Sequence, residues 1–315
     1  MKKILILSIS ILLFSSAAFN QVQLTQYFQD GTYYNPAAAG TQEAICASMY
    51  GRQQWMGLSD EEGNQIAPMS VVFNLHAPVY ALNSGIGLNV VYDKSGFEQN
   101  MGVKLNYAYI KTLQDERKSI SVGIGVSMLN KTIDYENYIL EQPSDPLLQS
   151  KQSESGKITD MDFGIQYQDR RKFYAGISGV NLLGSSAEIG NVSYSQDRNV
   201  YITGGYYIKV IEKRKQSLYV VPSLLIKSNL VNMQIDISAR AEYNNLMAGL
   251  SYRYQDAVAV LAGVNLNGFR FGASYDLTTG SLSNASNGSV EIFIGYCHTI
   301  RPKVKLNSLY NTRYL

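Results

Sequence analysis

The stretch Met233-Gln-Ile-Asp-Ile-Ser-Ala-Arg-Ala-Glu-Tyr243 alternates strictly between apolar and polar residues. A period of two predicts a β-strand whose two faces meet different surroundings. Asp236, Arg240 and Glu242 all fall on the polar face, and a basic residue pointing at lipid near the midplane costs about 2–4 kcal/mol. We therefore expect the polar face to line the inside of a membrane barrel and the apolar face to meet lipid.

The same alternation recurs along the chain and predicts about 14 strands, most of them with the roughly 9–11 residues that a tilted spanning strand requires. Residues 99–112 and 269–276 repeat it clearly, with tyrosine, phenylalanine and valine on one face and lysine, asparagine and arginine on the other. The expected strands are residues 44–53, 68–78, 82–92, 99–112, 119–130, 158–168, 172–181, 198–210, 216–228, 232–243, 246–254, 258–267, 269–276 and 289–298.

The connections between these strands switch between long and short. Long ones follow the first, fifth, seventh and thirteenth strands, at residues 54–67, 131–157, 182–197 and 277–288. Tight turns follow the even strands, and Asn267-Gly268 is a strong hairpin signal. Outer-membrane barrels have short periplasmic turns and longer external loops. The pattern predicts an all-β fold, a closed antiparallel up-and-down transmembrane β-barrel with both chain ends in the periplasm. A soluble β-sandwich also alternates, but it does not predict this switch.

The chain divides into four expected segments. Residues 1–20 are typical of a cleaved signal peptide, because Lys2 and Lys3 precede an apolar run that small residues follow. Residues 21–43 are expected to form a periplasmic N-terminal segment, and residues 44–298 the outer-membrane β-barrel. Residues 299–315 form a basic periplasmic tail, which is either disordered or a docking segment for a periplasmic partner.

Composition and motifs argue against several functional classes. The net charge is +2, without the basic excess that is typical of a nucleic-acid-binding protein. The two histidines, His76 and His298, have no metal-ligand spacing, and neither lies in a recognisable nucleophile motif. We therefore expect no enzymatic activity, no cofactor and no metal ion. The 24 tyrosines suit the two aromatic girdles of a membrane barrel.

The residues expected inside the barrel include charges of both signs in near balance. A water-filled pore and a narrow barrel filled by side-chain networks both fit such a lining. Gly85-x-Gly87 and Gly123-x-Gly125 lie inside strands, which indicates close backbone approach or strand curvature. The charged residues expected to point inward are Arg52, Lys104, Asp160, Asp162, Asp236, Arg240, Glu242, Arg253, Arg270, Asp276 and Glu291.

The two cysteines fall near the ends of the predicted barrel. Cys46 lies near the start of the first strand and Cys297 near the end of the last. In a closed barrel with an even number of strands these two strands are antiparallel neighbours, and the periplasm permits disulfides. The spacing suggests a bridge, or at least a close approach, across the closure seam. Two unrelated buried thiols are the alternative.

Several segments together resemble the PorP/SprF family. Residues 23–28, Gln-Leu-Thr-Gln-Tyr-Phe, and the block Asn35-Pro36-Ala-Ala-Ala-Gly40 are similar to the opening of that family. The block Arg52-Gln-Gln54-Trp55-Met-Gly57 resembles its Arg-x-Gln-Trp-x-Gly motif. Further similar blocks are Pro68 to Pro78 with His76, Gly85 to Leu88, Asp93 to Gly96, Ser274 to Asp276 and Glu291 to Tyr296.

The resemblance implies a non-enzymatic outer-membrane protein associated with type IX secretion. Its implied partners are outer-membrane lipid, other secretion components and a secreted or surface-anchored cargo protein, including the large adhesins of gliding motility. The motif residues carry no implied chemistry. Asn35-Pro36 and Gly40 suit a fixed periplasmic turn, and Trp55 suits an interfacial anchor. A diffusion channel or specific transporter is the alternative function. Secretion predicts a blocked lumen, whereas a channel predicts ion conductance.

Overall fold

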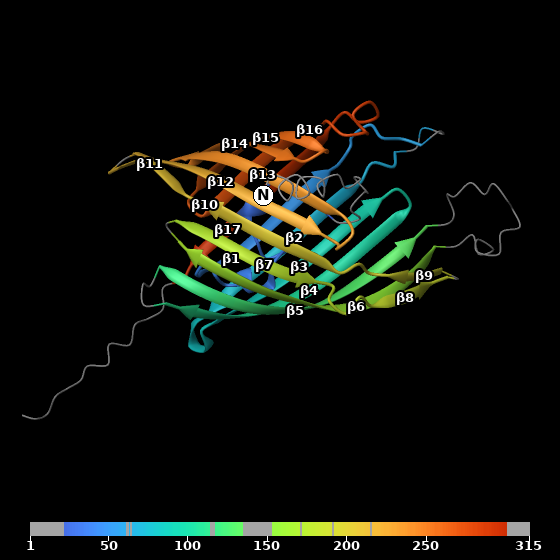
Figure 1. The fold of residues 1–315 in the computed structure, drawn as a ribbon, viewed down its shortest axis with the longest axis horizontal. Coiled ribbons are helices and arrows are strands. Elements are labelled where there is room, and N and C mark those ends of the chain that lie inside the picture. The colour runs from blue at the N-terminus through green and yellow to red at the C-terminus, as the bar shows by residue number, and fades with distance from the viewer. Residues whose placement is uncertain are drawn as a thin grey trace, which may run out of the picture.

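The computed structural model describes residues 22–60, 63, 65–113, 117–134, 153–170, 172–190, 192–214 and 216–300. These residues form a tilted antiparallel β-barrel (Figure 1). The expected signal peptide, residues 135–152 of the longest loop and residues 301–315 of the tail lie outside the described residues. No helix within the described ranges is long and apolar enough to cross a membrane.

The strands follow the predicted ranges closely. Their bounds are β1 Ala44–Gln53, β2 Met69–Val79, β3 Ser84–Ser95, β4 Glu98–Thr112, β5 Lys118–Ile133, β6 Glu154–Asp169, β7 Phe173–Val180, β8 Ser186–Ile189, β9 Val192–Ser195, β10 Asn199–Tyr206, β11 Ile208–Lys213, β12 Gln216–Ser228, β13 Met233–Tyr243, β14 Leu246–Arg253, β15 Ala257–Leu266, β16 Phe269–Thr278 and β17 Ser289–Thr299. Three short 3₁₀ turns accompany them in the part of the chain that the structure describes, η2 Tyr27–Gln29, η3 Pro36–Ala38 and η4 Tyr80–Leu82.

The sheet closes on itself. Among the described residues it has fifteen strands, and β10 and β11 both pair with β12, so they form one interrupted strand of a fourteen-strand barrel. The pairing of β10 with β12 closes one seam, and β1 pairs with β17 across the other. The predicted fold class is therefore confirmed. The strands β8 and β9 form a separate hairpin in the connection between β7 and β10.

Along the strands, apolar side chains are exposed on the outside of the barrel and polar side chains are buried inside, the reverse of a water-soluble protein. In β16, Phe269, Phe271 and Tyr275 are exposed on the outside, whereas Ser274 and Asp276 are buried inside. A water-soluble sheet would bury the aromatic face instead. The outer surface is thus built for lipid and the inner surface for polar contacts.

The barrel has two distinct ends. The end with the Asn244–Asn245 and Asn267–Gly268 turns is called the short-turn end, and the end that carries the β1–β2, β7–β10 and β16–β17 connections is called the long-loop end. In Figure 1 the long-loop end, with β8 and β9, lies to the right, and β11 lies to the left. The strands β5 and β6 have sixteen residues each and reach further into the longest connection than predicted.

The N-terminal segment differs most from its expected place. Residues 22–43 were expected in the periplasm, but the structure places them inside the barrel, and we call them the plug. Leu24, Tyr27 and Tyr34 of the plug are 1–2% exposed. Their apolar side chains form the hydrophobic core together with wall residues such as Tyr50 and Phe293. The physical reason is that these side chains lose contact with water only within the lumen.

Candidate functional site

The plug separates two cavities of the lumen. A cavity of about 400 Å³ lies on the long-loop side and is bounded by Val22 and Tyr33 of the plug. A second one of about 410 Å³ lies on the short-turn side and is bounded by plug residues 27–32 and by Thr41. The segment thus starts near the long-loop side and leads down to the start of β1. The resulting lumen is filled rather than open.

One half of the wall meets the plug through glycine. A Cβ atom on Gly85 of β3 would overlap the carbonyl oxygen of Ala39, and one on Gly123 of β5 would overlap the backbone of Ala37. Gly40, at a φ of +75°, sits with its own Cβ position 2.6 Å from the Cα of Gly85. The predicted close backbone approach at the Gly85 and Gly123 blocks is confirmed, and the approaching backbone is the plug.

Asn35 fixes the turn that contacts this wall. Its Oδ1 atom accepts a hydrogen bond from the backbone N–H of Ala37 at 2.9 Å and caps η3, and Pro36 starts η3. Its Nδ2 atom donates to the carbonyl oxygen of Ile165 in β6 at 3.1 Å. A Cβ on Gly164 would overlap the Asn35 amide. The Asn35-Pro36 block therefore forms a lumenal turn, and its expected place in a periplasmic turn is wrong.

The other half of the wall holds the plug through charge. The carboxylate of Glu291 in β17 accepts hydrogen bonds from the backbone N–H groups of Thr25 at 2.7 Å and Gln26 at 2.9 Å. Arg52 of β1 lies 2.8 Å from Asp276 and 3.4 Å from Glu291, and these three side chains are at most 1% exposed. The expectation that Arg52 is paired within the lumen is confirmed.

The ionic network extends along β13, β14 and β16. Arg253 pairs with Asp236 at 2.8 Å and with Asp276 at 3.3 Å. The Thr25 hydroxyl donates to Asp276 at 2.8 Å, so one plug residue joins both ion pairs. Buried charges of both signs that are paired and hydrogen-bonded can persist without water, whereas an unpaired one cannot. We call Arg52, Asp236, Arg253, Asp276 and Glu291 the charged latch.

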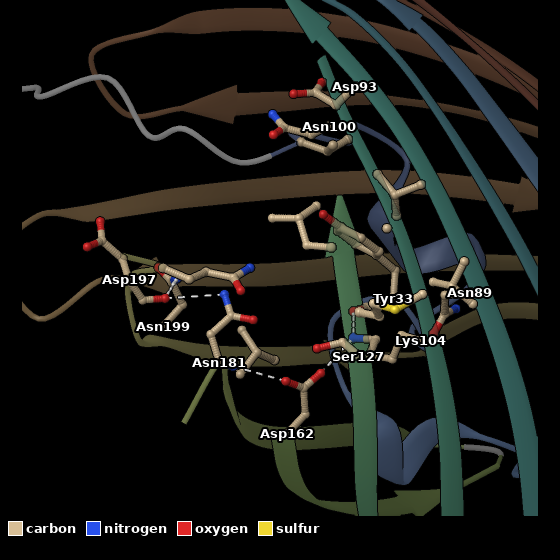
Figure 2. Close-up of a pocket in the computed structure, with 18 of the residues that line it drawn as sticks. Tyr33, Asn89, Asp93, Asn100, Lys104, Ser127, Asp162, Asn181, Asp197 and Asn199 are labelled. Carbon is tan, nitrogen blue, oxygen red and sulfur yellow. Dashed lines mark hydrogen bonds and ion pairs between the residues drawn. The ribbon is translucent and has the colours of Figure 1, made fainter. Parts of the chain in front are cut away.

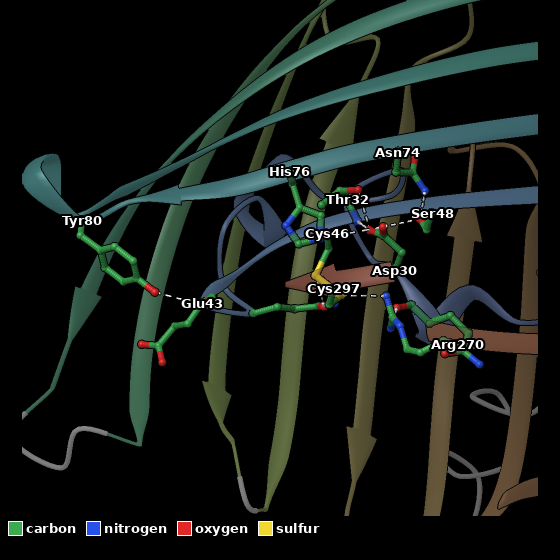
Figure 3. The surroundings of a disulfide bond; sticks show 12 residues. Asp30, Thr32, Glu43, Cys46, Ser48, Asn74, His76, Tyr80, Arg270 and Cys297 are labelled. Atoms are coloured by element: carbon green, nitrogen blue, oxygen red, sulfur yellow. Dashed lines mark hydrogen bonds and ion pairs between the residues drawn. A yellow bond between two sulfur atoms is a disulfide. The ribbon is translucent and has the colours of Figure 1, made fainter. Parts of the chain in front are cut away.

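A third contact region lies at the short-turn side, beside the closure seam (Figure 3). Cys46 and Cys297 are cross-strand partners and are joined by a disulfide. Nearby, Asp30 of the plug accepts a hydrogen bond from Ser48 at 2.6 Å. His76 is 2% exposed, and its Nε2 atom lies 3.9 Å from Asp30. The seam and the plug are therefore packed together.

The buried tyrosines of the plug are neutral. Burial raises the pKa of Tyr27 and Tyr34 above the ordinary value of a phenol. The Tyr27 hydroxyl lies 3.2 Å from the Ser238 hydroxyl of β13. These rings therefore fill the lumen without adding charge to it.

The remaining motif residues gather at the long-loop end. The backbone N–H of Gln54 donates to the carbonyl oxygen of Pro68 at 2.8 Å. Trp55 and Gly57 follow in the β1–β2 connection with positive φ. These residues shape that connection and do not reach the charged latch. Asp93, near the end of β3 with a hydrogen bond from Ser70, and Gly96, in the β3–β4 turn, lie at the same end. Pro78 lies in β2 beside Gly40, towards the short-turn end.

Sequence reasoning missed the plug residues Leu24, Thr25, Tyr27 and Tyr34. A usable signal was present, because a segment expected in water carries several large apolar side chains next to strands rich in inward glycine. Among the described residues no group of three or more histidine, cysteine or acidic side chains is arranged to hold a metal ion.

Comparison with known proteins identifies the family. The family model described as "Type IX secretion system membrane protein PorP/SprF" matches residues 16–296. This chain belongs to the PorP/SprF family. Its association with type IX secretion and its location in the outer membrane follow from the family and the barrel. None of the curated proteins matches the sequence.

Several solved structures are similar to this PorP/SprF protein at low identity. The "CymD monoaromatic hydrocarbon channel" has 11% identity and a TM-score of 0.48, with 91% of this chain and 95% of that chain covered. The toluene transporter TodX of Pseudomonas putida has 8% identity and a TM-score of 0.48, with 86% and 94% covered. A FadL homologue of Pseudomonas aeruginosa has 10% identity and a TM-score of 0.44, with 86% and 94% covered.

Proposed function

We propose that this protein is a non-enzymatic component of type IX secretion that assists the export or surface attachment of specific cargo, such as the large adhesins of gliding motility. The family supplies the link to secretion. The observation that carries the proposal is the plug, because a lumen filled by residues 22–43 suits a docking or anchoring protein better than a conduit.

The way in which the plug is held supports this role. The chain contacts opposite walls of the barrel, through Asn35 at β6 and through Thr25 at β16 and β17. A diffusion channel needs a continuous aqueous path, and a segment fixed on two sides occupies the lumen where that path would run. The cargo and its other secretion partners then meet the two ends of the barrel rather than its lumen.

The proposal includes an orientation. The short-turn end faces the periplasm, since outer-membrane barrels keep their short turns there. The last described strand, β17, ends at that side, so the basic tail at residues 301–315 follows in the periplasm, where it is a candidate docking segment. The long-loop end faces the cell exterior. Val22 of the plug lies beside the long-loop cavity, so residues 22–43 run inside the lumen to the start of β1.

The decisive experiment compares the secreted and surface proteomes of the parent strain and a deletion strain. Loss of one or a few large surface proteins supports a dedicated cargo partner. Loss of all type IX cargo places the protein in the shared machinery. Unchanged cargo contradicts the secretion proposal.

A planar-bilayer recording distinguishes the channel alternative. The purified protein is expected to give no steady ion conductance, whereas a variant without residues 22–40 is expected to conduct through the emptied lumen. Steady conductance of the parent protein would favour the channel.

A further inference from the structure

The long-loop cavity is a formed pocket of about 400 Å³ between the plug and the long-loop end. Figure 2 shows polar side chains on two facing banks, Asp93 and Asn100 on one side and Asn181 and Asn199 on the other. Val22 and Tyr33 of the plug form part of the pocket lining. A volume of this size lies at the lower end of the roughly 300–1,000 Å³ range of ligand pockets.

One wall of the pocket is fixed by buried carboxylates. Asp160 is 0% exposed and accepts backbone hydrogen bonds from Met161 at 2.7 Å, Leu183 at 2.9 Å and Ser185 at 3.1 Å. Asp162 accepts one from Asn181 at 3.0 Å. These two residues of β6 therefore fix the beginning of the β7–β10 connection through its backbone N–H groups.

The same connection is held from the side by an arginine. The Arg198 side chain donates to the carbonyl oxygens of Leu182 at 3.0 Å and Leu183 at 3.2 Å. The hairpin of β8 and β9 continues the wall, and the Lys131 ammonium lies over the Tyr194 ring in β9, 4.5 Å from the ring centroid. A wall ordered before a ligand arrives lowers the entropy that binding would cost.

The charges at this pocket already have partners within the protein. Lys104 pairs with Asp162 at 3.0 Å and donates to the carbonyl oxygen of Tyr33 at 2.8 Å. Asp93 accepts from Ser70 at 2.5 Å, and Asp197 accepts from Asn229 at 3.3 Å. An anionic ligand would meet the three carboxylates of the lining with one lysine, and a cationic ligand would compete with Lys104 for Asp162, so an uncharged ligand suits the pocket best.

The rest of the lining is amphipathic. Amide and hydroxyl groups come from Asn100, Asn199, Gln196 and Ser127, and apolar surface comes from Val22, Val91, Val180 and the Tyr33 ring. Asn199 donates to the carbonyl oxygen of Asp197 at 2.8 Å and Asn100 is hydrogen-bonded to Asp93, but each amide keeps further donors or acceptors that face the pocket. An apolar ligand would leave these remaining polar atoms without partners, at a cost of about 1–3 kcal/mol each. A ligand with hydroxyl groups on one side and C–H groups on the other matches both surfaces.

We propose that this pocket binds a neutral saccharide of two or three sugar units from the long-loop side. Extended peptides commonly add to a free strand edge, and the barrel strands that line the pocket are paired on both sides. Among the described strands that line it, β9 pairs on one side only, with β8, so the peptide probe below tests that edge. The recognition is separate from the secretion role, so either one can fail alone.

The test is isothermal titration calorimetry on the full mature protein in detergent. The neutral probes are maltotriose, cellotriose, mannotriose and N,N′,N″-triacetylchitotriose, and the charged probes are chitosan trimer and trigalacturonate. N-acetyl-triglycine amide serves as the uncharged peptide. At least one neutral trisaccharide is expected to bind, and the charged probes and the peptide are expected not to bind.

A double variant ties the binding to this pocket. Asn100→Leu with Gln196→Leu removes an amide from each side of the pocket and is expected to raise the Kd of the trisaccharide at least tenfold. Asn265→Leu is the matched control, because Asn265 lines the cavity on the other side of the plug, and it is expected to leave the affinity unchanged. The proposal is overturned if no neutral trisaccharide binds, if a charged probe or the peptide binds instead, or if the double variant binds like the parent. An unchanged circular dichroism spectrum of each variant shows that the barrel is folded.

Discussion

The two halves of the barrel wall hold the same plug by different means. The half formed by β3 to β7 presents glycine, and the plug backbone from Asn35 to Gly40 lies directly against Gly85, Gly123 and Gly164. The half formed by β12 to β17 together with β1 presents charge, and Thr25 and Gln26 are hydrogen-bonded to Glu291 and Asp276.

The difference shows how a narrow lumen can hold a segment of the same chain. Where the plug approaches the wall most closely, only a wall residue without a Cβ leaves room for it. On the other half, arginine and carboxylate side chains contact the plug, although Gly272 of β16 also leaves room for the Gln26 amide. Each of these charges needs a partner because little water remains. Steric fit sets the position of one side, and charge pairing sets the position of the other.

Filling the glycine half is expected to have the largest effect. Gly85→Ala with Gly123→Ala places two methyl groups where plug backbone atoms lie, and overpacking costs about 1–3 kcal/mol at each site. The plug is expected to leave its seat, which appears as new ion conductance in a planar bilayer. Gly102→Ala in β4 is the control, since its nearest neighbour would be 3.7 Å away. Equal conductance in both variants would contradict the steric role of this wall.

Removing the central charge of the other half comes next. Arg52→Ala leaves Glu291 buried without its cation, and breaking a buried ion pair costs about 3–5 kcal/mol. The free energy of unfolding in urea measures the loss. Arg170→Ala breaks the more exposed pair with Glu43, and it is expected to cost about 0–1 kcal/mol. Similar losses for the two variants would show that the charged latch is not desolvated.

The closure seam is expected to contribute a smaller amount. Cys46→Ser with Cys297→Ser removes the disulfide, and such a loss costs about 2–4 kcal/mol, mostly through the unfolded chain. The barrel is expected to remain closed, because β1 and β17 pair along their whole length. A non-reducing peptide map of the parent protein should contain the two cysteine peptides linked. Recovery of both cysteine peptides with free thiols would show that the disulfide between Cys46 and Cys297 does not form.

The smallest expected effect concerns the turn within the plug. Asn35→Ala removes the cap of η3 and the hydrogen bond to Ile165, and loss of such a cap costs about 0.5–2 kcal/mol. Asn35→Asp keeps the cap but not the donor, so it separates the two contacts. Melting temperatures of the two variants check this order, and a cost above that of Arg52→Ala would place the main anchor in the glycine half.

Most of the wall could be predicted from sequence, because lipid and lumen impose opposite demands on successive residues. β1 at Ala44–Gln53 matches the predicted range at both ends. The prediction was less exact at β5 and β6, which continue beyond the predicted ends. One strand was also predicted where β10 and β11 are separated at Tyr207.

The plug could not be placed in the same way. Residues 22–43 have neither a period of two nor a helical period, and only short 3₁₀ turns form there. Their apolar side chains indicate burial but not the surface that buries them. For the glycines of β3 and β5, the sequence therefore predicted a close backbone approach but not which part of the chain approaches.

The sequence by itself determined the membrane barrel, the number of its strands, the inward direction of the charges and the neighbourhood of the two cysteines, since alternation and chain order fix these locally. Only the tertiary structure decided that the lumen is filled, that Glu291 binds the backbone of Thr25 and Gln26, and that Asn35 rests on Gly164. Those contacts join residues more than a hundred positions apart, and their existence depends on the radius of the closed barrel, which no local pattern encodes.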